Sequence, residues 1–203
     1  MKDTLYLGSQ SSSRQKLLKA ASIPFVVVSH TSDELVVKDN MPFDRYVMEI
    51  AQEKIRHLSL PKLSQEEDYH YVLTADTLIH IVSSGRILGK PIDRDDAKNM
   101  LRAMRNELVE VITGCCLQKH NLSTQNTSAV WSTGALIEFN VDESSIDSYF
   151  DKEPDILHAS GSCMVDFGYG QSFFKSINGS YSAVIGLPLF ELRQELKKMG
   201  FVF

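Results

Sequence analysis

The chain has 203 residues, 43% of them hydrophobic and 23% charged, which is enough to bury the core of one large globular domain or two lobes. Its formal net charge of −5 argues against a general nucleic-acid-binding protein, which would usually be basic. The sequence contains neither an apolar signal segment near its start nor an apolar run of roughly 20 residues that could span a membrane. We therefore expect a cytoplasmic protein without a membrane or stable nucleic-acid partner. The three cysteines have no C-x-x-C spacing, so a zinc site or a disulfide framework is not expected.

The first part of the chain predicts a strand, a hydroxyl-rich loop, a helix and a second strand. These elements correspond to residues 5–7, the polar stretch 9–13, a helix ended by Pro24, and residues 25–29. A second helix begins near Pro42 and carries apolar residues at helical spacing. Lys54 lies beside this apolar stripe and could lean toward a cleft, although a surface lysine is the ordinary alternative.

The later part of the chain predicts long strands with helices between them. In order, these are a buried strand at 71–75, a hairpin around 83–85, a helix capped by Asp93, two antiparallel β-rich stretches at 109–119 and 129–141, a short helix capped by Asp142, and a last helix from Pro188 to near Gly200. The order predicts an α/β protein with a bent, mixed β-sheet flanked by helices. We expect one domain over residues 1–203, with two lobes around a central cleft.

The most informative motif is Ala75-Asp76-Thr77, followed by Gly89-Lys90-Pro91. An aspartate directly after an apolar strand is costly to bury without a cation or hydrogen bonds. Such a carboxylate can hold a divalent cation or orient a water, and a lysine on a nearby turn can neutralise phosphate oxygens. The alternative is an Asx-turn that leads into the hairpin.

Three other polar motifs are weaker on their own. Ser9-x-Ser11-x-x-Arg14 stands at a predicted helix start, where backbone amides attract phosphate, but a serine N-cap explains the spacing equally well. Asp33-Glu34 is a carboxylate pair that also suits a solvated loop. The segment 177–188 predicts a structural turn before the last helix.

Taken together, these segments resemble the Maf family of nucleoside triphosphate pyrophosphatases, some members of which are linked to septum formation. The matching stretches are residues 5–18, Asp33-Glu34, Ala51-Gln52-Glu53-Lys54, Ala75-Asp76-Thr77, Gly89-Lys90-Pro91, residues 97–101 and residues 177–188. The resemblance implies a cytoplasmic house-cleaning enzyme, often dimeric. Such an enzyme hydrolyses a nucleoside triphosphate to the monophosphate and pyrophosphate with Mg²⁺ or Mn²⁺.

The resemblance also implies roles for individual residues. The family's proton acceptor falls on Asp76, and we expect Asp76 and Glu34 to be the catalytic and metal-binding carboxylates. The residues expected to bind the triphosphate are Ser9, Ser11, Arg14, Lys54 and Lys90.

Three positions bear on the choice of base. The family's Ser-Pro-Arg-Arg reads Ser11-Ser12-Ser13-Arg14, so Ser13 replaces an arginine tied to dTTP and UTP. Thr77 matches the dTTP/UTP branch, whereas Asp166 resembles the glutamate of the branch that acts on 7-methyl-GTP. We rank hydrolysis of dTTP, UTP or modified pyrimidine nucleotides first. The alternatives are a 7-methyl-GTP pyrophosphatase and a non-catalytic nucleotide-binding regulator of cell division.

Overall fold

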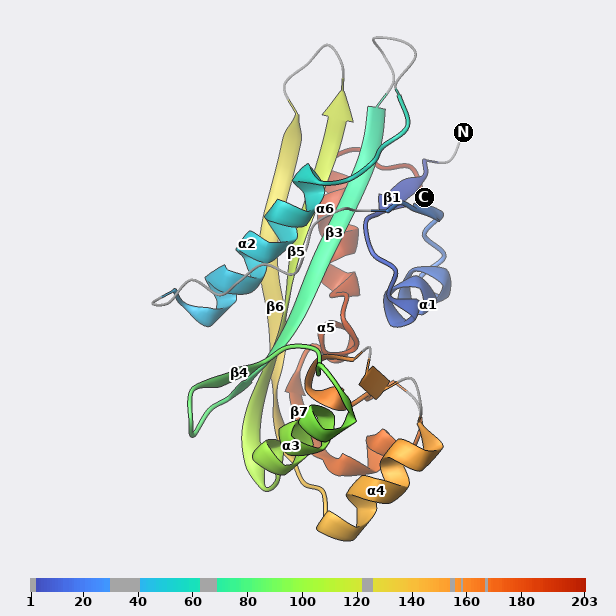
Figure 1. The fold of residues 1–203 in the computed structure, drawn as a ribbon. Coiled ribbons are helices and arrows are strands. Elements are labelled where there is room, and N and C mark those ends of the chain that lie inside the picture. The colour runs from blue at the N-terminus through green and yellow to red at the C-terminus, as the bar shows by residue number, and fades with distance from the viewer. Residues whose placement is uncertain are drawn as a thin grey trace. The chain divides into compact units, whose positions relative to one another are not determined.

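A computed structural model describes residues 3–29, 41–62, 69–121, 126–153, 156–157, 159–166 and 168–203 (Figure 1). The elements in chain order are β1 (Leu5–Leu7), α1 (Ser12–Ala20), β2 (Phe25–Val27), α2 (Phe43–Arg56), β3 (Tyr69–Ile81), β4 (Arg86–Leu88), α3 (Arg94–Met104), β5 (Glu107–Asn121), β6 (Thr127–Phe139), α4 (Glu143–Lys152), η2 (Ser160–Ser162), η3 (Tyr169–Phe173), β7 (Phe174–Gly179), α5 (Tyr181–Ile185) and α6 (Leu189–Lys198). The chain divides into two compact units. Unit 1 comprises Met1–Asp76, Thr113–Thr133 and Gly186–Phe203, and unit 2 comprises Thr77–Ile112 and Gly134–Ile185.

The described strands form one seven-stranded sheet of mixed direction. Their order is β2-β1-β3-β5-β6-β7, with β4 paired to β3. β1 runs parallel to both β2 and β3, whereas β4 is antiparallel to β3 and β7 is antiparallel to β6. The predicted α/β class with a mixed sheet and flanking helices is confirmed. A single domain with a central cleft stays a prediction.

In unit 1, alternate residues of β3 point to opposite faces of the sheet. Tyr71, Leu73 and Ala75 join a buried cluster with side chains of α1 and α6. On α2 the apolar stripe is formed by Tyr46, Val47, Ile50 and Ala51, all of them buried, which confirms the helical spacing read from the sequence. α2 therefore packs through the face that also carries Lys54, two turns after Tyr46.

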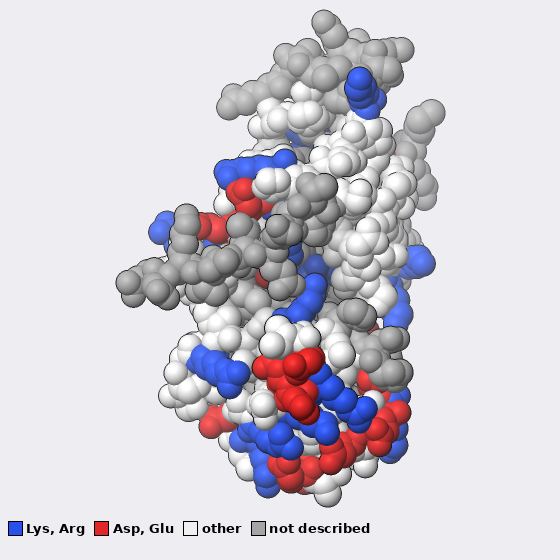
Figure 2. Space-filling view, in the orientation of Figure 1, with Lys and Arg blue, Asp and Glu red and all other residues white. Residues whose placement is uncertain are grey.

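In unit 2, α3 and α4 lie against each other and share one buried cluster with the strands. Its members include Ala97, Leu101, Ile146 and Tyr149. Figure 2 shows acidic and basic side chains intermixed over these two helices. The pairs between them are Arg94–Asp151 (2.7 Å), Lys98–Asp147 (2.5 Å) and Arg102–Glu143 (2.8 Å). Such exposed pairs each contribute little to stability, so the apolar contacts dominate here. No described helix meets the length and hydropathy required to cross a membrane.

The position of Asp76 differs from the sequence-based expectation. Asp76 does not follow the end of a strand, because β3 continues through it to Ile81. The continuation is stabilised by the antiparallel pairing of Ile79 with Leu88 of β4. β1 is much shorter and ends at Leu7, opposite Leu73. Asp76 therefore lies on the part of β3 that extends beyond the carboxyl end of β1.

Candidate functional site

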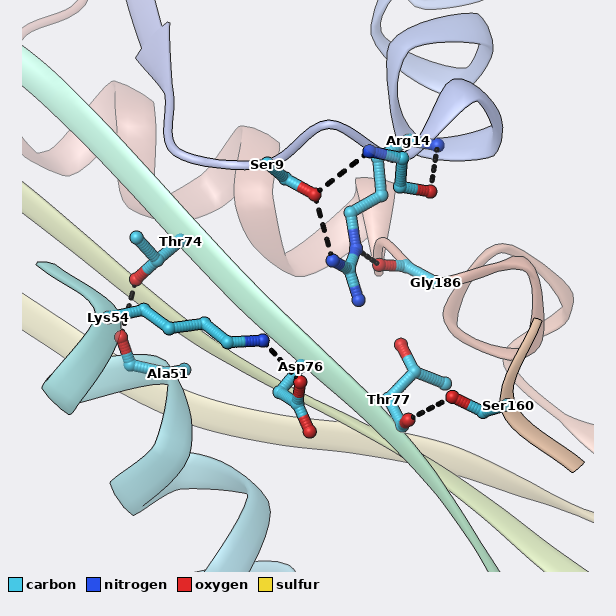
Figure 3. Close-up of polar contacts among 10 residues, drawn as sticks. Ser9, Arg14, Ala51, Lys54, Thr74, Asp76, Thr77, Ser160 and Gly186 are labelled. Carbon is cyan, nitrogen blue, oxygen red and sulfur yellow. Dashed lines mark hydrogen bonds and ion pairs between the residues drawn. The ribbon is translucent and has the colours of Figure 1, made fainter. Parts of the chain in front are cut away.

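The centre of the site in unit 1 is an ion pair between α2 and β3. The Lys54 Nζ lies 2.5 Å from the Asp76 Oδ1 (Figure 3). The two side chains are 20% and 18% exposed, so both are shielded without being cut off from solvent. A half-buried ammonium beside a carboxylate provides both signs of charge that metal-bound triphosphate chemistry requires.

A buried hydrogen bond holds the same helix on the same strand. The Thr74 hydroxyl donates to the Ala51 carbonyl oxygen of α2 at 2.5 Å, and both residues are fully buried. Thr74 and Asp76 are two residues apart on β3, so they point to the same face of the sheet. Ala51 and Lys54 are three residues apart on α2, so they too lie on one helical face.

The loop after β1 contributes a cation and hydroxyl groups. The Arg14 Nη1 donates to the Ser9 hydroxyl at 3.0 Å, and its Nε donates to the Gly186 carbonyl at 2.7 Å. The Ser11 hydroxyl accepts from the Arg14 backbone N–H at 3.4 Å, which makes Ser11 the N-cap of α1. The capping alternative is therefore correct for Ser11, while Ser9 orients the Arg14 guanidinium.

Electrostatic interactions connect the Arg14 and Asp76 parts of unit 1. Burial lowers the pKa of the Arg14 guanidinium, and the negative charge of Asp76 opposes that change. Burial raises the pKa of Tyr46, and the Asp76 charge acts in the same direction. Asp76 is therefore close enough to influence both residues, and its charge favours the cationic form of Arg14.

The sequence-predicted residues fall into three groups. Those described within unit 1 are Ser9, Ser11, Ser13, Arg14, Lys54 and Asp76. Those within unit 2 are Thr77, Lys90 and Asp166. Glu34, predicted as a catalytic and metal-binding carboxylate, lies outside the described residues.

Unit 2 joins the segments that carry the predicted specificity residues. The Ser160 hydroxyl donates to the Thr77 carbonyl at 2.7 Å. The Gly161 N–H donates to the Gly89 carbonyl at 2.8 Å, directly before Lys90. The Tyr181 hydroxyl donates to the Val165 carbonyl at 3.3 Å, directly before Asp166. The β3 strand, the Gly89-Lys90-Pro91 turn and the late loop are thus hydrogen-bonded in one place within this unit.

Sequence reasoning assigned no site role to Gly186 or Tyr46. The sequence predicts a structural turn at Gly186, yet the Gly186 carbonyl orients Arg14, and its φ of 124° favours glycine. Helical spacing predicts that Tyr46 packs in the core, and Tyr46 is buried. Its place two turns before Lys54 was the signal that could have linked it to the site.

The described residues contain no group of three or more His, Cys, Asp or Glu side chains that could hold a metal ion. Asp76 is the predicted metal ligand that the structure describes. Mg²⁺ is commonly bound by one or two carboxylates together with substrate phosphates and waters. Asp76, shielded but still open to solvent, fits this kind of site, in which the nucleotide supplies further ligands.

The fold and the site together define an α/β protein that gathers a carboxylate, a lysine and an oriented arginine, the residue types that bind phosphate groups and a divalent cation. The chain belongs to the family described as Maf-like protein, whose sequence profile matches residues 4–199. The family resemblance seen in the sequence is thereby confirmed.

Several curated relatives carry the same name. The dTTP/UTP pyrophosphatase of Bacillus cereus (strain G9842) is 34% identical over 195 residues, which cover 96% of this chain and 94% of the relative. The dTTP/UTP pyrophosphatase of Xanthomonas euvesicatoria pv. vesicatoria is 33% identical, over 97% of this chain and 98% of the relative. The dTTP/UTP pyrophosphatase of Colwellia psychrerythraea is 33% identical, over 98% of this chain and 89% of the relative.

Among solved structures, the chain is similar to a nucleoside-triphosphatase / dITP/XTP pyrophosphatase from Mycobacterium abscessus. The TM-score is 0.37 at 12% identity, over 97% of this chain and 94% of that one. A likeness this distant says nothing about activity or substrate.

Proposed function

We propose that this protein hydrolyses dTTP and UTP to the nucleoside monophosphate and pyrophosphate. The observation that carries the proposal is the 2.5 Å contact between Lys54 and Asp76 in the unit that also holds the oriented Arg14. The names of relatives that match nearly the whole chain at 33–34% identity support the choice of substrate.

The proposed reaction uses Asp76 as the proton acceptor. A water attacks the α-phosphorus, Asp76 takes a proton from that water, and the bond between the α-phosphorus and the bridging oxygen breaks. The pyrophosphate leaves with the electron pair of that bond. Lys54 contacts Asp76, so its ammonium can hold the triphosphate beside the carboxylate that orients the water.

The cations of unit 1 balance the charge of the leaving pyrophosphate. Arg14 offers a planar guanidinium that Ser9 and Gly186 hold in one orientation. The family resemblance adds two residues to the proposal. Lys90 is proposed to contact the triphosphate, and Glu34 is proposed as a second carboxylate. Mg²⁺ or Mn²⁺, when bound by Asp76, Glu34 and the nucleotide, supplies charge neutralisation of the phosphates.

Base choice is proposed to depend on unit 2. Thr77, the late loop with Asp166 and the turn before Lys90 are linked there by hydrogen bonds. Ser13, the third position tied to base choice, lies in the first turn of α1 and belongs to unit 1. The relatives' names favour dTTP and UTP over 7-methyl-GTP, despite the carboxylate at position 166.

The location and assembly of the enzyme are part of the proposal. We expect a cytoplasmic protein, as the family resemblance implies, acting on free nucleotides rather than on nucleic acid. The net charge of −5 supports action on free nucleotides, because a nucleic-acid-binding protein would usually be basic. A homodimer stays a prediction that size-exclusion chromatography with light scattering can test.

The test is a nucleotide panel that includes dTTP, UTP and 7-methyl-GTP, with and without Mg²⁺ or Mn²⁺. We expect pyrophosphate from dTTP and UTP, none with EDTA, and a loss of about 10³-fold in kcat for Asp76→Asn, since the general base is removed. The matched control is Asp44→Asn, an exposed aspartate on α2. Nucleotide-dependent thermal stabilisation without any turnover would instead favour a non-catalytic regulator.

A further inference from the structure

We propose that Thr74 is a positioning residue, which fixes α2 along β3 and thereby holds the Lys54 ammonium against Asp76. The inference rests on the proposed function, because it assigns Thr74 to the same site. It adds a residue that neither touches the triphosphate nor takes part in proton transfer.

The chemistry of Thr74 requires an explanation. The residue is completely buried in the middle of β3, where valine would have the same shape and the same preference for a strand. A buried hydroxyl costs stability unless it forms a hydrogen bond. The Thr74 hydroxyl forms its bond with the Ala51 carbonyl, which belongs to α2 and not to the sheet. The group thus joins two elements that apolar packing alone already brings together.

Directionality distinguishes this bond from the other contacts of α2. Apolar burial decides which helical face meets the sheet, but it is non-directional and tolerates sliding along the helix axis. A hydrogen bond has narrow limits of distance and angle. The Thr74–Ala51 bond therefore specifies which turn of α2 lies over which residue of β3.

The spacing converts this local bond into a constraint on the site. Ala51 and Lys54 are about one turn apart on α2, roughly 4.5 Å along its axis. Thr74 and Asp76 are two residues apart on β3, roughly 6.7 Å. Figure 3 shows the Lys54 side chain extended from α2 along β3, and its ammonium ends 2.5 Å from the Asp76 carboxylate. A shift of α2 by one ångström would move the ammonium by a comparable amount.

The chain offers a matched control on the same strand. The Tyr71 hydroxyl is likewise buried on β3 and donates to a backbone carbonyl, that of Met199, at 3.0 Å. Tyr71 points to the opposite face of the sheet, away from α2. Tyr71→Phe and Thr74→Val each remove one buried hydroxyl and preserve the shape of the side chain. The two variants therefore differ mainly in the face of the sheet on which a hydrogen bond is lost.

The experiment compares kcat, KM and melting temperature for the wild type, Thr74→Val, Thr74→Ser and Tyr71→Phe. We expect Thr74→Val to lower kcat about tenfold or more, because a misplacement of about 1 Å is costly in an active site. Thr74→Ser keeps the hydroxyl and should restore most of the rate. Tyr71→Phe should keep kcat within about twofold of the wild-type value, even if its melting temperature falls as much as that of Thr74→Val. Wild-type kcat in Thr74→Val, or equal losses in Thr74→Val and Tyr71→Phe, would overturn the inference.

A second measurement does not depend on turnover. Lysines carrying ¹³C-methyl groups give an NMR resonance for Lys54 that Lys54→Arg identifies by its disappearance. We expect Thr74→Val to move this resonance toward its position in Asp76→Asn, where the ion pair is lost, while Tyr71→Phe leaves it in place. An unmoved resonance overturns the positioning role whatever the kinetics show. If the wild type hydrolyses no nucleotide, the proposed function fails, and this measurement alone decides the role of Thr74.

Discussion

Arg14 is held at two of its nitrogen atoms by groups from different parts of unit 1. Its Nε donates to the Gly186 carbonyl and its Nη1 donates to the Ser9 hydroxyl. The planar fork of a guanidinium allows these bonds and keeps its charge at all relevant pH values. A cation that is oriented before the ligand arrives loses little conformational freedom when it binds phosphate.

Replacing Arg14 by lysine tests this preorganisation. A lysine ammonium keeps the charge but cannot reproduce the geometry of the two bonds. We expect Arg14→Lys to raise KM for dTTP about tenfold with a smaller change in kcat, as measured by pyrophosphate release, because binding to the triphosphate is weakened uniformly. Arg86→Lys, at the exposed first residue of β4, is the matched control. An unchanged KM in Arg14→Lys would show that the guanidinium geometry has no part in binding.

For individual residues, the sequence predicts which side chains belong to the site, but it does not predict the hydrogen bonds that orient them. Sequence motifs indicate Ser9, Arg14, Lys54 and Asp76, and the structure places all of them in one unit. The Gly186 carbonyl could not be predicted, because it acts through its backbone and lies 172 residues from Arg14. A backbone acceptor leaves no side-chain signature, and a contact this distant in sequence leaves no local periodicity.

Among the elements, α2 has the strongest influence on the site. It carries Lys54 and lies against both β3 and β5. On β5, a Cβ added to Gly114 would come within 2.3 Å of the Val47 carbonyl oxygen of α2. Glycine therefore permits a close approach of helix backbone to strand backbone that any other residue would prevent.

Gly114→Ala should accordingly push α2 away from the sheet. We expect a loss of about 1–3 kcal/mol in the free energy of unfolding, as for other overpacked cores, measured by urea denaturation. Because Lys54 moves with the helix, kcat/KM should fall as well. Gly85→Asn is the control, since the Gly85 position has open space around it and asparagine tolerates its φ of 70°. Wild-type stability in Gly114→Ala would contradict the close approach.

The elements were predictable where one local rule applied. Helical spacing predicted α2, and Asp93 caps α3 by accepting from the Asp96 N–H at 2.8 Å. Two competing local signals misled the prediction. The serine-rich run suggested a loop through position 13, but α1 begins at Ser12 because Ser11 caps it. Asp76-Thr77 suggested a turn, but β3 runs through both residues and pairs with β4 only from Ile79 onward.

At the level of the whole molecule, the boundary between the two compact units falls between Asp76 and Thr77, on one continuous strand. β5 and β6 also contribute residues to both units. The proposed proton acceptor and the nearest proposed specificity residue are therefore neighbours in sequence but belong to different units. The alternation of strands and capped helices was enough to predict the fold class. The division into units depends on contacts between distant segments, which no local pattern encodes.

Three strands that pass from one unit into the other should couple the unfolding of the two. Melting one unit would leave half of each strand without its hydrogen-bonding neighbours, and unpaired backbone groups are costly. We expect scanning calorimetry to show one transition, with a calorimetric enthalpy equal to the van't Hoff enthalpy. A non-hydrolysable α,β-methylene analogue of dTTP at about 100 times its Kd should add about 2.7 kcal/mol to the unfolding free energy and move that one transition as a whole. Two separate transitions, or a shift in only part of the profile, would contradict the prediction of a single domain over residues 1–203, because each unit would then be stable without the other.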